Sequence, residues 1–180
     1  MQGTIRRAYT LIEVLIVVTV LGIAASMVVP AFSQTNTLRL QAAVRTIVAD
    51  ITQAQSDAVA LQAPQAIVFF AEGAESRYII APISGTMVDI SPDVIVTRLI
   101  GGEEFGNAIL TNMTIPDGVL VFDAMGGPVQ APGSDVPAST ASIQVRAGDQ
   151  AYVITIEAYT GRVTVQSVAV ETVEEVPTGT

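Results

Sequence analysis

Residues 6–25 read RRAYTLIEVLIVVTVLGIAA. Two arginines are followed by an apolar run, and one carboxylate, Glu13, lies inside that run. No charged residue occurs from Val14 to Leu38. Counted from Tyr9, the apolar segment has about 20 residues, enough for one helix to cross a hydrocarbon core of roughly 30 Å. The sequence therefore predicts a membrane helix over residues 9–30 that carries one acidic residue near its start.

The charges around this segment predict its orientation. Arg6 and Arg7 precede it and no basic residue follows closely, which places the N-terminus in the cytoplasm and the rest of the chain outside. A cleaved secretory signal is the alternative, but residues 24–26 form only a poor cleavage site. A carboxylate inside a bilayer needs a partner, so Glu13 is a candidate functional residue. The alternative is a side chain that reaches the interface near the positive end of the helix dipole.

The basic leader followed by Ala8, Tyr9 and the run TLIEVL resembles the class III signal peptides of type IV pilins and type II secretion pseudopilins. The resemblance implies that a prepilin peptidase cuts between Ala8 and Tyr9 and methylates the new amine of Tyr9. It also implies that Glu13 pairs with the terminal amine of a neighbouring subunit during filament assembly. This chain has Ala8 and Tyr9 where that family usually has Gly and Phe.

A second apolar pattern predicts that the helix continues over residues 31–63. Pro30 lacks a backbone donor and clashes with the preceding turn, so a kink is expected there. A helix end followed by a flexible link at 33–37 is the alternative. Apolar residues then recur at spacings of three and four, the pattern of an amphipathic helix, and Pro64 should stop it. They are Leu40, Val44, Ile47, Ile51, Ala54, Ala58 and Leu61.

Residues 64–170 change to β-rich runs separated by turns that contain Gly, Pro and Asp. We expect strands at 66–70, 78–81, 94–100, 109–115, 119–122, 142–146, 151–158 and 162–170. Residues 126–139 are predicted to be a loop, and the acidic residues 171–180 a frayed tail.

Three parts of this half resemble minor pseudopilins of the GspH/FimT type. They are residues 51–58, where Gln55 stands at a position that is commonly arginine, residues 121–128, and residues 152–156 together with 160–163. The resemblance implies an α+β fold in which a long N-terminal helix, membrane-spanning in its first half, packs on an antiparallel β-sheet domain.

The composition excludes several kinds of chemistry. The 180 residues contain no Cys, His or Lys, which removes thiolate nucleophiles, imidazole bases and the usual zinc ligands. The acidic residues lack the spacing of a calcium loop and are predicted to be solvated; the candidates are Asp89, Asp93, Glu103, Glu104 and Asp117. We therefore expect no enzyme activity, no metal and no cofactor.

The net charge of −9 and the scattered arginines disfavour a nucleic-acid partner. With the resemblance, the sequence predicts a minor pseudopilin of a type II secretion system. Such a subunit is anchored by one helix in the inner membrane, with its globular domain in the periplasm. It assembles with other pseudopilins or pilins into the tip or priming complex of a periplasmic filament. The alternatives are a minor type IV pilin of pilus biogenesis or DNA uptake and, more weakly, an enzyme on a signal anchor.

Overall fold

The computed structural model describes residues 10–169, and within this range the side chains of residues 26–35 are left undescribed. The leader 1–8, Tyr9 and the tail 171–180 lie outside the described residues. The chain divides into two compact units, Met1–Asn36 and Thr37–Thr180. Each unit is described by itself below.

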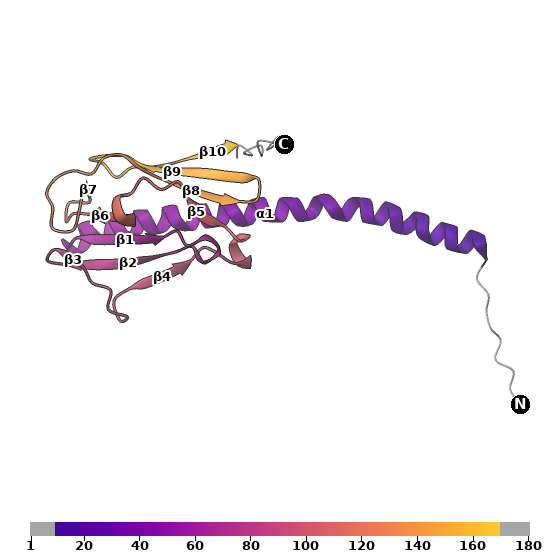
Figure 1. Ribbon diagram of the computed structural model, residues 1–180, viewed down its shortest axis with the longest axis horizontal. Coiled ribbons are helices and arrows are strands. Elements are labelled where there is room, and N and C mark those ends of the chain that lie inside the picture. The colour runs from indigo at the N-terminus through magenta and orange to yellow at the C-terminus, as the bar shows by residue number, and fades with distance from the viewer. Residues whose placement is uncertain (1–9, 170–180) are drawn as a thin grey trace, which may run out of the picture. The chain divides into compact units, whose positions relative to one another are not determined.

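One helix, α1, spans Leu11–Leu61 (Figure 1). It starts after Thr10, whose hydroxyl oxygen accepts a 3.3 Å hydrogen bond from the N–H of Glu13, so Thr10 acts as the N-cap. Residues 30–37 are helical, so the alternative of a helix that ends at Pro30 is wrong. The kink predicted at Pro30 stays a prediction.

The helix ends three residues before Pro64, close to the predicted stop. Gln62 has a left-handed backbone with φ 51°, and the N–H of Ala63 donates to the carbonyl of Ala58 at 3.1 Å. This six-residue closure satisfies an orphan carbonyl of the last turn, as in a Schellman motif. The chain then turns back toward the domain.

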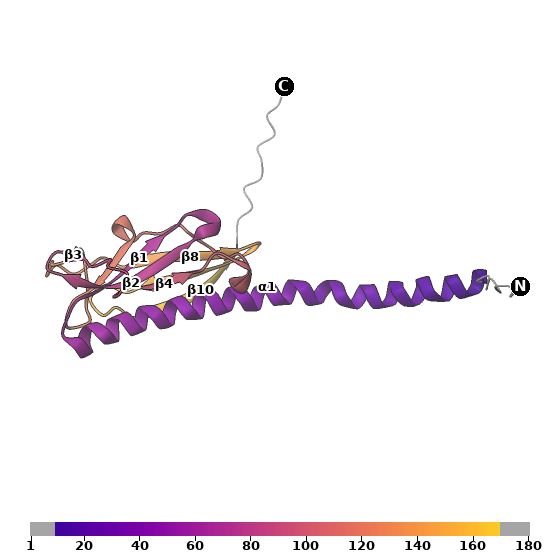
Figure 2. The ribbon, with the colours of Figure 1, turned by 90° about the horizontal axis from the view of Figure 1, so that it is seen from below.

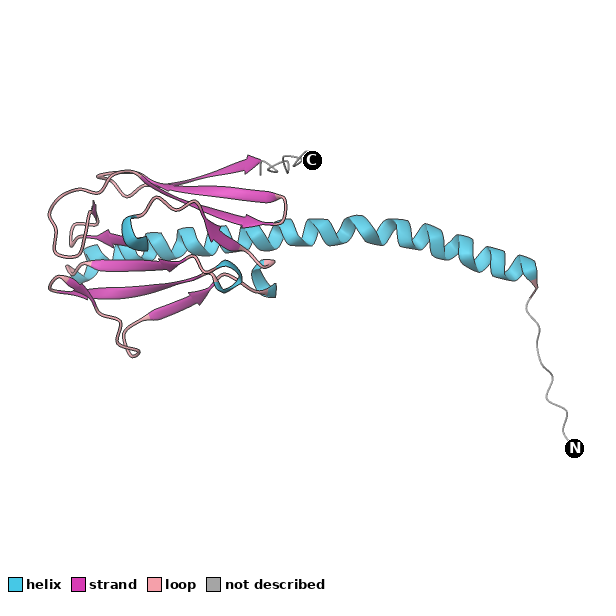
Figure 3. Cartoon of the chain, viewed as in Figure 1, coloured by secondary structure: helices cyan, strands magenta, loops and turns pink. Residues whose placement is uncertain are grey.

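Within the described residues, ten strands form two antiparallel sheets, and the strands are drawn in magenta in Figure 3. The first sheet has the order β3-β2-β1-β6-β7, with β4 also paired to β2. Its strands are β1 (Gln65–Phe70), β2 (Arg77–Ser84), β3 (Met87–Val88), β4 (Val96–Leu99), β6 (Val119–Phe122) and β7 (Pro128–Val129). The second sheet has the order β10-β9-β8-β5. Its strands are β5 (Ile109–Thr111), β8 (Ala141–Ala147), β9 (Gln150–Ile156) and β10 (Val163–Ala169).

Three short 3₁₀ turns in the described part of the chain lie between these strands, at Gly73–Glu75, Glu103–Phe105 and Pro116–Gly118. The last is the turn predicted from its Pro, Asp and Gly. The resulting α+β architecture, a long N-terminal helix packed on antiparallel sheet, is the predicted fold class.

The second half of α1 supplies one side of the core (Figure 2). Six of the seven residues of the predicted stripe are buried, at 5% exposure or less. They are Leu40, Val44, Ile47, Ile51, Ala54 and Ala58. Leu61 is 67% exposed, so its prediction as a core residue is wrong. It is the last residue of the helix.

Candidate functional site

The first described part of α1 presents an apolar surface to solvent. Every described side chain from Leu11 to Ala25 is exposed. Leu11 is 85% exposed and Ile12 66%. Within the residues the structure describes, no helix combines the length and the apolar character that crossing a membrane requires. The span predicted at 9–30 falls only partly among residues with described side chains.

Glu13 lies in the first turn of this helix, three residues after the N-cap. Its backbone N–H is bonded to Thr10, while no described side chain or backbone group bonds its exposed carboxylate. Thr10 and Glu13 have the spacing of a capping box, in which an acidic side chain at this position suits the helix N-terminus. The carboxylate is therefore available to a partner outside the described residues. Ala8 and Tyr9, the predicted cleavage site, lie outside the described residues 10–169.

The second half of α1 is fixed to its domain by polar contacts as well as by the core. The hydroxyl of the fully buried Tyr78 donates to Oδ2 of Asp50 at 2.7 Å. Nε of Arg98 donates to the same oxygen at 3.0 Å. One helix carboxylate thus holds β2 and β4 together. Burial, with the hydrogen bond to Asp50, raises the pKa of Tyr78 above its usual range.

Gln55 makes a second polar link between α1 and the sheets. Its Nε2 donates to the carbonyls of Gly126, at 2.7 Å, and Thr160, at 2.9 Å. A Cβ at Gly126 would lie 2.8 Å from Cγ2 of Val59, and a Cβ at Gly161 would lie 2.6 Å from Nε2 of Gln55. Both glycines also have positive φ, so any other residue would be disfavoured at these two positions by backbone strain as well as by the steric clash. The β6–β7 and β9–β10 turns are thereby held against one helix residue.

Two further contacts extend this attachment toward the start of the domain. Nη1 of Arg39 donates to the carbonyl of Glu103 at 3.0 Å. Nε2 of Gln41 donates to the hydroxyl of Tyr152 at 3.1 Å. From Arg39 to Gln55, the helix is therefore bound to both sheets and to a connecting turn.

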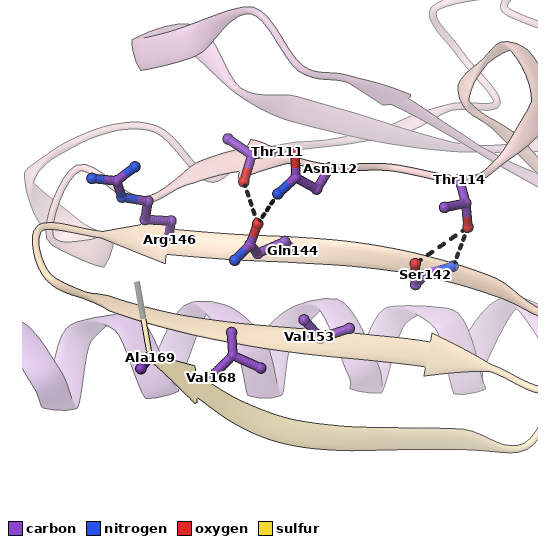
Figure 4. A pocket seen from close by; sticks show the side chains of 9 residues that line it. All are labelled: Thr111, Asn112, Thr114, Ser142, Gln144, Arg146, Val153, Val168 and Ala169. Carbon is purple, nitrogen blue, oxygen red and sulfur yellow. Dashed lines mark hydrogen bonds between the residues drawn. The ribbon is translucent and has the colours of Figure 1, made fainter. Parts of the chain in front are cut away.

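Two surface hollows of the domain adjoin the second sheet. The first, of about 690 Å³, lies on the outer face of the second sheet (Figure 4). Its lining is mostly polar: Gln144 accepts hydrogen bonds from Thr111 and Asn112, and Thr114 pairs with Ser142. The second, of about 500 Å³, lies between α1 and strands β9 and β10, and its lining is mostly apolar.

Residues 4–29 match the prokaryotic N-terminal methylation motif. The type IV minor pilin FimU of Pseudomonas aeruginosa, in space group P21, matches with a TM-score of 0.52 and 18% identity. The match covers 75% of this chain and 92% of that chain. The chain has a pilin-like fold. The same pilin in space group P65 gives a TM-score of 0.49 and 16% identity, with 71% and 92% covered. No curated protein matches in sequence.

The matched motif contains Ala8, Tyr9 and Glu13, so the resemblance recognised in the first residues is confirmed at the level of the motif. The pilin-like fold confirms it at the level of architecture. The polar links through Asp50 and Gln55 were missed as such. Asp50 lies outside the stripe of apolar residues, and nothing in the sequence indicates that a strand tyrosine reaches it.

Proposed function

We propose that this chain is a minor pilin-like subunit that assembles through its N-terminal helix into a periplasmic filament, without catalytic activity. The observation that carries the proposal is the combination of an N-terminal methylation motif with a pilin-like fold. The exposed apolar surface over residues 11–25 supports it, because such a surface needs either lipid or other helices to cover it.

In this proposal a prepilin peptidase removes residues 1–8, and Tyr9 becomes the methylated N-terminus. The helix over residues 9–30 then anchors the chain in the inner membrane, with the domain in the periplasm. On assembly, the carboxylate of Glu13 pairs with the terminal ammonium of a neighbouring subunit. A charge-assisted hydrogen bond of this kind offsets the cost of holding a carboxylate in an apolar environment.

The filament that we favour is the pseudopilus of a type II secretion system, with this subunit in the tip or priming complex. A minor pilin of a type IV pilus is the second candidate, and the likeness in fold to FimU favours it. The two are separated by deleting the gene in the native host. Loss of protein export with normal pili supports the first, and loss of pili with normal export supports the second.

The first experiment is to co-express the full-length chain with a prepilin peptidase and to measure the mature N-terminus by mass spectrometry. We expect a product that begins at methylated Tyr9. An uncut chain, or a cut beyond Ala24, would contradict the proposal.

The role of Glu13 is tested separately with Glu13→Val. We expect normal membrane insertion and cleavage but strongly reduced incorporation into purified filaments. Thr19→Val is the matched control, because it also replaces a polar residue of the same helix by Val and leaves the carboxylate in place. Equal incorporation of both variants would remove the role assigned to Glu13.

A further inference from the structure

The second sheet ends in a strand with an unprotected edge. β10 pairs with β9 along all seven of its residues, Val163 to Ala169, and no described residue pairs with its other side. Its sequence, VTVQSVA, contains no charge and no proline. Soluble proteins usually block such an edge with a charge, a proline, a bulge or a very short strand, because a free edge accepts further strands.

The other edge strands of the described residues are blocked in these ways. β3 and β7 have two residues each, and β7 begins with Pro128. β5 has three residues. β4 has four and includes Arg98, which is held by Asp50. The free edge of β10 is therefore a distinct feature and not a general property of this domain.

An apolar groove runs beside this edge. Its walls are one face of α1, with residues spaced by three and four, and the inward-facing sides of β9 and β10. The lining consists of Gln41, Val44, Arg45, Val48, Ala49, Tyr152 and Val165. Val165 is 42% exposed, although it pairs with the fully buried Ile154 of β9. The inner face of the sheet thus continues past β9 with apolar surface that no described residue covers.

One charge borders this groove. Arg45 is exposed and has no ion pair or hydrogen bond from its guanidinium within residues 10–169. A carboxylate on an incoming segment would complement it. A second copy of this chain is disfavoured as the occupant, because each copy without residues 1–8 keeps 6 of the 8 basic and all 17 acidic residues, 6 − 17 = −11, and the two repel.

We propose that β10 accepts a strand from a different pilin-like subunit. The added segment is extended, presents apolar side chains to the groove at alternate positions, and carries an acidic residue that reaches Arg45. Backbone hydrogen bonds to β10 supply affinity, and the groove supplies selectivity, as in other cases of strand addition. The inference rests on the proposed function, since it takes its partner from the same filament.

The test uses the full-length chain in its native host, with a photo-crosslinking amino acid at Ala49, in the groove. The matched control is the same amino acid at Ala42, an exposed alanine of α1 that does not line the groove. We expect the Ala49 position to crosslink to a strand segment of another chain that carries the N-terminal methylation motif. The Ala42 position should give much less of that product, because it does not line the groove.

Two variants examine the chemistry of the contact. Val165→Lys places a charge on the inner side of the edge and should abolish the Ala49 crosslink. Arg45→Glu should reduce it, whereas Arg162→Glu changes the net charge equally at an exposed position outside the groove and should not. Equal effects of the two arginine variants would contradict the acidic contact.

Three outcomes would overturn the inference: equal crosslinking from both alanines, crosslinking to a second copy, or crosslinking to residues 170–180 of the same chain. The mature N-terminus and the filament content of the sample are measured in parallel. A chain that is cut, methylated and incorporated, yet gives no Ala49 crosslink, refutes the strand addition alone. A chain that is neither cut nor incorporated refutes the proposed function.

Discussion

The two ends of α1 place their apolar residues in opposite environments. Ile16, in the first part, is 56% exposed, whereas Ile47, in the second part, is fully buried. No described side chain of the first part belongs to the core of the domain, whereas the second part contributes seven buried side chains. An apolar residue of this helix therefore stabilises the domain only where a sheet covers it. Elsewhere it is available to lipid or to another chain.

Removing apolar volume from the two parts tests this difference most strongly. Ile47→Ala should lower the free energy of unfolding by about 2–5 kcal/mol, because it removes a buried side chain and leaves a cavity. Ile16→Ala is the matched control and should leave the unfolding of the domain unchanged. Urea unfolding of the purified chain in detergent measures both. A similar loss in both variants would show that the first part is packed on the domain.

The contact through Asp50 should have the next largest effect. Asp50→Ala removes the acceptor of the buried Tyr78 hydroxyl and the ion-pair partner of Arg98. A buried donor without a partner costs about 1–3 kcal/mol, which is the expected loss in stability. Asp57→Ala is the control, because Asp57 is bonded only to Gln53 on the same helix among the described residues. The measurement is again urea unfolding, and equal losses would contradict the assigned role of Asp50.

Gln55 should contribute less, because its contacts are neutral hydrogen bonds. Gln55→Ala removes the donor shared by the carbonyls of Gly126 and Thr160, with an expected loss of about 1 kcal/mol. The amides of the two turns should also exchange faster with solvent, since both turns lose their attachment to α1. Gln53→Ala, on the exposed side of the helix, is the control for hydrogen exchange by mass spectrometry. Unchanged exchange in the turns would contradict the link.

The sequence predicts the fold where a local pattern carries the information. The stripe from Leu40 to Ala58 and the stop before Pro64 are local, and both are confirmed. The strands β3 and β7 were missed, because each has two residues and exists only by pairing with β2 and β6. The expected strand at 109–115 ends at Thr111, and the chain then adopts a positive φ at Asn112.

The division into two sheets could not be read from the sequence for a related reason. It depends on which strands pair over long distances, and alternation within a strand does not encode the partner. The same difference between local and long-range information applies to the candidate functional residues. The motif around Glu13 is local and was recognised, whereas the groove beside β10 is formed by residues more than 100 positions apart.

The last expected effect is a dependence of stability on alkaline pH, and it concerns the Tyr78 hydroxyl that α1 holds through Asp50. The pKa of Tyr78 is raised in the folded state, mainly by burial, so the folded chain keeps a proton that the unfolded chain loses. This contribution to stability is complete below the unfolded pKa near 10 and is lost as the pH rises above it. The slope approaches about 1.4 kcal/mol per pH unit.

Tyr78→Phe should cost about 1 kcal/mol at pH 7 and remove this part of the slope. Tyr159→Phe, at a side chain that is 75% exposed, should retain it. Urea unfolding between pH 8 and 11 measures both slopes. Equal slopes in the two variants would mean that folding does not raise the pKa of Tyr78, which would contradict a buried hydroxyl that donates to Asp50.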